Sequence, residues 1–224
     1  MTVCPFAAWK PVQNHGGRMS AHLGLILHVQ EGNGGLSGWF NNPASGASST
    51  WWVGKGGALE QYVDADVTAW AQGNGNGTYN SVETEGYHDE ALTAAQEDTL
   101  AQLYAWGAQV YKWGNVLAEA PGDEGFGWHG MGGSAWGGHT GCPGDVRKPR
   151  RAPILAAAFG PTPAPEPEEE LEVIIIRSPD GAMSMFDGTK KVGLVDTQSA
   201  GAFQAAGIKV ANISKNQYDR IPNA

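Results

Sequence analysis

The sequence has 224 residues and a formal net charge of -9 at pH 7. A chain of this length can bury one well-formed core and carry a smaller second unit. Its excess of acidic groups argues against nucleic acid as a partner, because phosphate binding needs clustered Lys and Arg. Gly (33) and Trp (9) both exceed ordinary usage, which favours glycine-rich loops with aromatic walls.

The N-terminal segment has no cationic stretch followed by an apolar run, so it does not match a secretory signal. No apolar run reaches the length of a membrane span, and we expect no membrane insertion. We expect a monomer that stays in the cytoplasm of the cell that makes it unless another protein releases it. Cys4 and Cys142 are too few for an exported disulfide scaffold, so Cys142 is expected to be free or metal-bound.

Strands and one helix are predicted in the first half of the chain. Leu23 to Val29 is a continuous apolar run of strand length, interrupted by His28 near its end. Three further strands are predicted, over residues 49–53, 59–64 and 81–85. Thr93 and Gln96 have capping-box spacing before a helical pattern that runs to about Trp113. This interleaving predicts an α/β domain.

Residues 126–145 are so rich in glycine that we expect neither a helix nor a strand there. A long segment without regular structure is uncommon inside a compact domain unless it has a function. The segment contains two histidines and Cys142. We therefore predict a functional loop.

A Pro- and Glu-rich spacer, residues 160–170, separates a first domain, 1–159, from a small C-terminal module, 171–224. In the module we expect strands over 172–177, 182–186 and 191–195, followed by a helix that ends near Ala206, which makes it α+β. By its position it is expected to bind cell wall. The alternative is a dimerisation or folding appendage.

His28, His129 and Cys142 form a candidate metal site. Imidazole nitrogen and thiolate sulfur suit zinc, and three protein ligands leave a fourth position for water. The alternative for His28 is a hydrogen-bonded core histidine within an apolar strand.

Five segments carry a resemblance to a known family, in this order and spacing: LILH (25–28), SSTWWVGKGGALEQYVD (48–64), TAW (68–70), SVETEG (81–86) and HTGCPGD (139–145). Together they resemble the type 2 N-acetylmuramoyl-L-alanine amidases, a family that includes phage endolysins and peptidoglycan recognition proteins. The resemblance implies a mixed central sheet with flanking helices. It also implies zinc-dependent hydrolysis of the bond between N-acetylmuramic acid and L-alanine in bacterial peptidoglycan. With the missing signal it suggests a phage endolysin that reaches the cell wall through a pore made by another protein.

The resemblance assigns zinc to His28, His129 and Cys142, and acid-base catalysis to Glu83. It also assigns Thr140, two residues before the cysteine, to hydrogen bonding with the developing oxyanion. His139 competes with His129, but it lies too close to Cys142 in sequence to match the family spacing; an insertion, GMGGSAWGG, then explains the longer gap. The alternatives for Glu83 and Thr140 are a solvated strand carboxylate and a surface threonine. Glu85 would face the same side of the strand as Glu83.

The sequence departs from the family where many members have a catalytic tyrosine followed by histidine, because Ser49 and Thr50 stand there. Five tryptophans are candidates for the walls of a substrate groove, with core packing as the alternative: Trp51, Trp52, Trp70, Trp128 and Trp136. Trp51 and Trp52 must point to opposite faces of a strand. Trp128 and Trp136 flank His129 and are favoured as substrate contacts, with Trp52 as a third.

A basic run, residues 147–151, is expected to be solvated, with contact to anionic wall polymers as the alternative. Two other functions stay open at this point. One is a non-catalytic peptidoglycan-binding module of the same fold. The other is a thiol hydrolase with Cys142 as nucleophile, which would need a base that lowers the thiol pKa.

Overall fold

The computed structural model describes residues 1–160, 174–180, 182–186, 191–193, 210–212 and 214–223. The chain separates into two compact units, Met1–Pro161 and Thr162–Ala224. Most of the expected Pro- and Glu-rich spacer lies outside the described residues. Within the described residues, no helix combines the length and the apolar character that a membrane span requires.

The first unit is built on a mixed six-stranded sheet in the order β1-β4-β3-β5-β2-β6. The strands are β1 (Ala8–Trp9), β2 (Gly24–Val29), β3 (Trp51–Val53), β4 (Leu59–Gln61), β5 (Asn80–Thr84) and β6 (Gly125–Trp128). β2 lies between β5 and β6 and is parallel to both. β3 is parallel to β5 and antiparallel to β4. The prediction of an α/β domain with a mixed sheet is confirmed.

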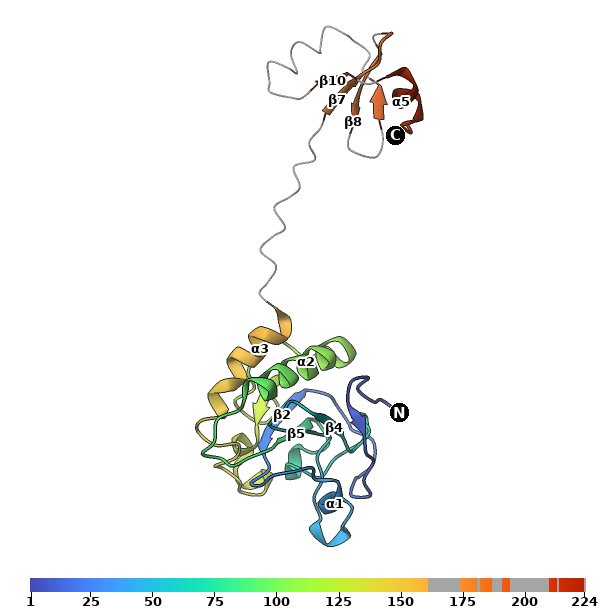
Figure 1. Cartoon of the computed structure of the whole chain (residues 1–224). Coiled ribbons are helices and arrows are strands. Elements are labelled where there is room, and N and C mark those ends of the chain that lie inside the picture. Colours follow the sequence, from blue (N-terminus) through green and yellow to red (C-terminus); the bar gives the residue numbers. More distant parts are fainter. Residues whose placement is uncertain (161–173, 181, 187–190, 194–209, 213, 224) are drawn as a thin grey trace. The chain divides into compact units, whose positions relative to one another are not determined.

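Two helices, α2 (Ala94–Tyr111) and α3 (Arg151–Phe159), pack together over one face of the sheet, as Figure 1 shows. The predicted capping box at the start of α2 is present, since Thr93 accepts the backbone N–H of Gln96 and the Gln96 side chain accepts the backbone N–H of Thr93. The main core lies between these helices and the strands, and Leu25, Leu27 and Trp51 belong to it. The two helices therefore cover this face of the sheet.

The short helices of the first unit are α1 (Ser37–Phe40), η1 (Pro43–Ser45), η2 (Gly73–Gly75) and η3 (His129–Trp136). On the other face of the sheet, Phe40 of α1 belongs to one core cluster with Trp52, and Trp136 of η3 belongs to another with Ile26. Because successive side chains of a strand point to opposite faces, His28 lies on this face while Leu27 and Val29 do not. Glu83 is the register partner of His28 on β5, and Trp52 is the partner of Glu83 on β3. The sheet therefore places these three side chains in one row.

The expectation that residues 126–145 form neither strand nor helix was wrong. β6 is a strand at the edge of the sheet, and η3 is a 3₁₀ segment with a kink at Gly133. Glycine is compatible with β6 because neighbouring groups approach closely: a Cβ on Gly127 would lie 2.7 Å from Cδ1 of Ile26. Phe126 supplies the buried side chain that anchors the strand in the main core.

The described part of the second unit contains a four-stranded sheet in the order β10-β7-β8-β9 and a short helix. Its elements are β7 (Ile174–Arg177), β8 (Met183–Phe186), β9 (Lys191–Gly193), β10 (Val210–Asn212) and α5 (Lys215–Arg220). The first three agree with the predicted strands. The helix expected to end near Ala206 falls outside the described residues.

Candidate metal centre

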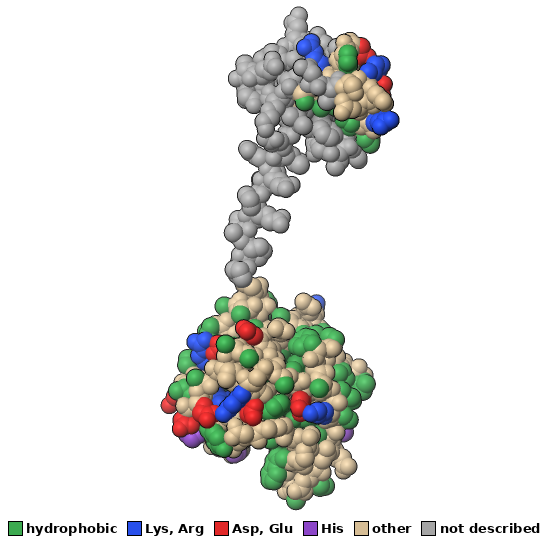
Figure 2. All heavy atoms as spheres, in the orientation of Figure 1, with side chains coloured by type: hydrophobic (Ala, Val, Ile, Leu, Met, Phe, Trp, Pro, Cys, Tyr) green, Lys and Arg blue, Asp and Glu red, His purple; other side chains and the backbone are tan. Residues whose placement is uncertain are grey.

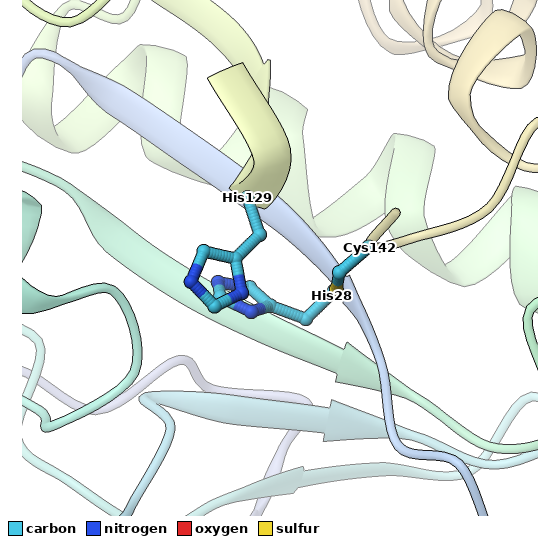
Figure 3. Close-up of side chains that lie close together, drawn as sticks. All are labelled: His28, His129 and Cys142. Atoms are coloured by element: carbon cyan, nitrogen blue, oxygen red, sulfur yellow. The ribbon is translucent and has the colours of Figure 1, made fainter. Parts of the chain in front are cut away.

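Figure 3 shows the side chains of His28, His129 and Cys142 converging from separate parts of the chain. One potential ligand atom from each lies within 4.8 Å of the others, and this is the one such cluster among the residues that the structure describes. His28 is near the end of β2, and His129 directly follows β6. Since β2 and β6 are parallel neighbours, their carboxyl ends bring both imidazoles to one edge of the sheet.

Cys142 reaches the histidines because the intervening chain loops out and returns. The backbone N–H of Gly130 donates to the carbonyl oxygen of Cys142 at 3.0 Å. A Cβ on Gly130 would lie 2.4 Å from the carbonyl oxygen of Thr140, so only glycine allows this approach. The long sequence gap between His129 and Cys142 therefore does not separate them in space.

Both histidines use one ring nitrogen for a hydrogen bond and leave the other free. Nε2 of His28 lies 3.1 Å from Oε1 of Gln72, and Nε2 of His129 lies 2.9 Å from the carbonyl oxygen of Trp136. Burial, followed by the charge of His129, holds the pKa of His28 well below its usual range, so this imidazole is neutral. Burial also lowers the pKa of His129, which favours its neutral form. Two neutral imidazoles and a thiol sulfur fit the ligand preferences of zinc.

Cys142 is poorly suited to act alone as a nucleophile. Burial raises the pKa of its thiol, and the nearby charge of Glu83 raises it further. The backbone N–H of Val29 donates to Sγ at 3.4 Å, which opposes the shift only in part. Because the thiolate is the reactive form, these surroundings favour ligation of a cation, which stabilises the thiolate, over nucleophilic catalysis.

Glu83 lies beside the cluster, with Oε1 3.8 Å from Nδ1 of His28. Its side chain is 17% exposed, and its Oε2 is buried without a hydrogen-bond partner in the protein. Burial raises the pKa of Glu83 to about 8, against an opposing effect of the Arg147 charge. An unpartnered carboxylate oxygen with this pKa is suited to accept and release a proton near neutral pH.

The cluster opens into a cavity of about 540 Å³. Glu83 and Thr140 line it together with the three candidate ligands, and His139 lies at its wall. The His139 ring is exposed, with its centroid 5.1 Å from that of His129 and its atoms outside the three-residue cluster. Glu31 and His88 form an exposed pair at the wall, with Nδ1 of His88 2.8 Å from Oε1 of Glu31.

The family model for N-acetylmuramoyl-L-alanine amidases matches residues 18–145, which is more than half of the chain and includes every candidate ligand. The chain belongs to this family. No curated protein sequence matches this amidase family member at a significant level.

Solved structures of similar fold include a selenomethionine derivative of AmpD. It is 18% identical with a TM-score of 0.54, and the match covers 68% of this chain and 96% of AmpD. The N-acetylmuramoyl-L-alanine amidase LysC from Clostridium intestinale URNW is 13% identical with a TM-score of 0.53, covering 70% of this chain and 98% of LysC. The Staphylococcus aureus hydrolase AmiA is 16% identical with a TM-score of 0.54, covering 71% of this chain and 85% of AmiA. At these identities the likeness shows the amidase fold.

The three tryptophans expected to contact substrate do not line the cavity of this amidase domain. Trp136 is 3% exposed and packs against Ile26 and Tyr79. Trp52 is buried in a second core cluster and donates its indole N–H to Oε1 of Gln30. Trp128 is partly exposed, with the Lys148 ammonium over its ring at 3.6 Å and its indole N–H donating to Glu119.

Ser49 and Thr50, at the family's tyrosine and histidine positions, are buried away from the cavity lining. The Ser49 hydroxyl donates to the carbonyl oxygen of Trp51 and lies 3.1 Å from the Ser81 hydroxyl. Glu85 does not join Glu83, because its carboxylate accepts the backbone N–H groups of Gly34 and Lys55. It therefore stabilises the loops above the strand ends.

The basic run 147–151 is only partly solvated, contrary to expectation. Arg147 and Arg151 are buried, and each donates to backbone carbonyls; Arg147 bonds to those of Glu85 and Glu90. On the face of the first unit drawn in Figure 2, basic and acidic side chains are interspersed. Sequence reasoning missed Arg147 and Gln72, because the single sequence shows neither the burial of a cation nor the hydrogen bond that a distant amide makes.

Proposed function

We propose that this chain hydrolyses the amide bond between N-acetylmuramic acid and L-alanine in bacterial peptidoglycan, with zinc held by His28, His129 and Cys142. The observation that carries the proposal is the position of Glu83, which lines the same cavity as the three-donor cluster and whose Oε1 lies 3.8 Å from Nδ1 of His28. Membership of the N-acetylmuramoyl-L-alanine amidase family supports this choice of bond.

His28, His129 and Cys142 would hold the zinc, which when bound would supply Lewis-acid activation of water and of the scissile carbonyl. Glu83 takes a proton from the attacking water and delivers it to the leaving nitrogen of L-alanine. The Thr140 hydroxyl, at the cavity wall, donates a hydrogen bond to the carbonyl oxygen as negative charge develops there. Each role uses a side chain that already lines the cavity.

The test is to incubate the full chain with purified peptidoglycan, with and without a metal chelator, and to identify the new chemical ends. We expect free amino groups on L-alanine, formed only without chelator. New reducing ends of glycan would overturn the bond assignment. Binding without any cleavage would support the non-catalytic module, and cleavage that survives the chelator but not thiol alkylation would support the thiol hydrolase.

We further propose that the protein is a phage endolysin that acts as a monomer and meets the wall after release through a pore made by another protein. A solved endolysin amidase, LysCS from Clostridium intestinale URNW, shares the fold at 13% identity with a TM-score of 0.53. In this proposal the second unit binds cell wall and raises the local enzyme concentration on an insoluble substrate. A chain ending at Gly160 should then be retained less by purified walls than the full chain, and equal retention would contradict wall binding.

A further inference from the structure

Gln72 is a buried amide whose orientation is fixed by its partners. Its Nε2 donates to the carbonyl oxygens of Tyr79 at 3.0 Å and Gly75 at 3.4 Å. Since a carbonyl only accepts, the amide cannot be turned around, and Oε1 must face Nε2 of His28. An amide oxygen also only accepts, so Nε2 of His28 carries the hydrogen and Nδ1 keeps its lone pair.

The same logic applies to His129, whose Nε2 faces the carbonyl oxygen of Trp136 at 2.9 Å. That carbonyl is a main-chain acceptor and requires the hydrogen on Nε2. Both imidazoles are thus held with Nδ1 free, although their hydrogen-bond partners come from segments more than 60 residues apart in sequence.

The segments that carry Gln72 and Trp136 pack against each other. A Cβ on Gly75, three residues after Gln72, would lie 2.5 Å from Cε2 of Trp136. Gly73 has φ +51°, and a Cβ there would lie 2.9 Å from the carbonyl oxygen of Ala135. The Trp136 ring is also 5.5 Å from the ring of Tyr79, whose carbonyl holds the Gln72 amide. Because these contacts are close, neither segment can move without displacing the other.

We infer that Gln72 and Trp136 form one outer support that locks His28 and His129 in the tautomer presenting Nδ1 to the metal. The glycine-rich insertion then has a structural task, because it places the Trp136 carbonyl against His129 and the Trp136 ring against the Gln72 loop. Both are positioning residues, since they act through the histidines. The inference rests on the proposed zinc site.

The first measurement uses the metal-free full chain labelled with ¹⁵N-histidine, with long-range ¹H–¹⁵N spectra showing which ring nitrogen carries hydrogen. We expect the Nε2–H tautomer for both His28 and His129. A dominant Nδ1–H tautomer at either residue in the wild-type chain would overturn the inference. This measurement needs neither zinc nor cleavage.

The second measurement compares zinc affinity in Gln72→Met and in a matched control, Gln61→Met. Gln61 is also fully buried, accepts one backbone N–H and donates to two carbonyls, those of Thr2 and Val63, but touches neither histidine. We expect Gln72→Met to weaken zinc binding by about 10- to 100-fold, as loss of an outer hydrogen bond to a ligating histidine does. Gln61→Met should lower the melting temperature without weakening zinc binding.

Equal zinc affinity in Gln72→Met and the wild-type chain would overturn the inference. If Gln72→Met fails to fold, Gln72→Glu keeps the acceptor and should retain the Nε2–H tautomer of His28; the Nδ1–H tautomer there would count against it. A wild-type chain that shows the expected tautomers but binds no zinc would instead overturn the proposed function. The two failures are thus distinguishable.

Discussion

Replacing His129 by alanine should remove zinc, whereas replacing His139 should not. Both are histidines of the same segment, and both line the cavity. Only His129 contributes a ligand atom to the cluster within 4.8 Å, and its Nε2 is already held by the Trp136 carbonyl. Among the contacts found for the described residues, the exposed His139 has no hydrogen bond that holds a ring nitrogen in place. Its ring would therefore have to become ordered in order to bind zinc.

The size of the effect follows from what one ligand contributes. Zinc binding to four-ligand structural sites is worth about 10 to 16 kcal/mol, or roughly 2.5 to 4 kcal/mol for each ligand. Loss of one ligand should therefore weaken binding by about 100- to 1,000-fold. His139→Ala should change zinc affinity by less than about threefold, because it removes no ligand atom.

The assay is competition for zinc between each full-length variant and a chromogenic chelator, with circular dichroism to verify folding. His139→Ala serves as the matched control for His129→Ala. Wild-type affinity in His129→Ala, with loss in His139→Ala, would reverse the ligand assignment and refute the argument from the cluster geometry.

Three further outcomes are expected. Glu83→Gln should keep zinc but lose cleavage by about 10²- to 10⁴-fold, and metal loss measured by atomic absorption would count against an acid-base role. Trp136→Ala should lower the free energy of unfolding by about 3 to 5 kcal/mol in urea, as truncation of a buried tryptophan does. It should also lower zinc affinity. A raised KM with unchanged stability would instead make Trp136 a substrate contact. Arg147→Met should lower the free energy of unfolding by about 3 kcal/mol, because buried carbonyls lose a charged donor. Arg150→Met is the control: this exposed side chain loses only its ion pair with Glu97, so the free energy of unfolding should change little. Equal effects of the two substitutions would contradict the burial argument.

The sequence predicted the sheet well where local pattern and tertiary structure agree. The apolar run around His28 became β2, and the capping box of Thr93 and Gln96 starts α2. It failed in the glycine-rich segment, where propensity argues against β6. There, close approach to Ile26 and the Cys142 turn decides the structure, and such contacts are invisible in a local pattern.

Much of the candidate site was predictable because its residues stand at strand ends or beside a distinctive turn. His28 and Glu83 were singled out through the family resemblance, and the structure shows that they are register partners on neighbouring parallel strands. The tryptophans were harder, because an aromatic residue beside a ligand can face the cavity or the core. Trp136 lies in the core and holds His129 only through its main chain, which no side-chain pattern encodes.

The central claim is that cleavage of the N-acetylmuramic acid to L-alanine bond depends on zinc held by His28, His129 and Cys142. The most direct measurement titrates zinc into metal-free full-length protein on purified peptidoglycan and counts newly exposed L-alanine amino groups. The rate should rise in proportion to zinc, level off at about one ion per chain, the ratio expected for one three-ligand site, and stay at background in Cys142→Ser. Full cleavage by the metal-free protein, or by Cys142→Ser without bound zinc, would contradict the account.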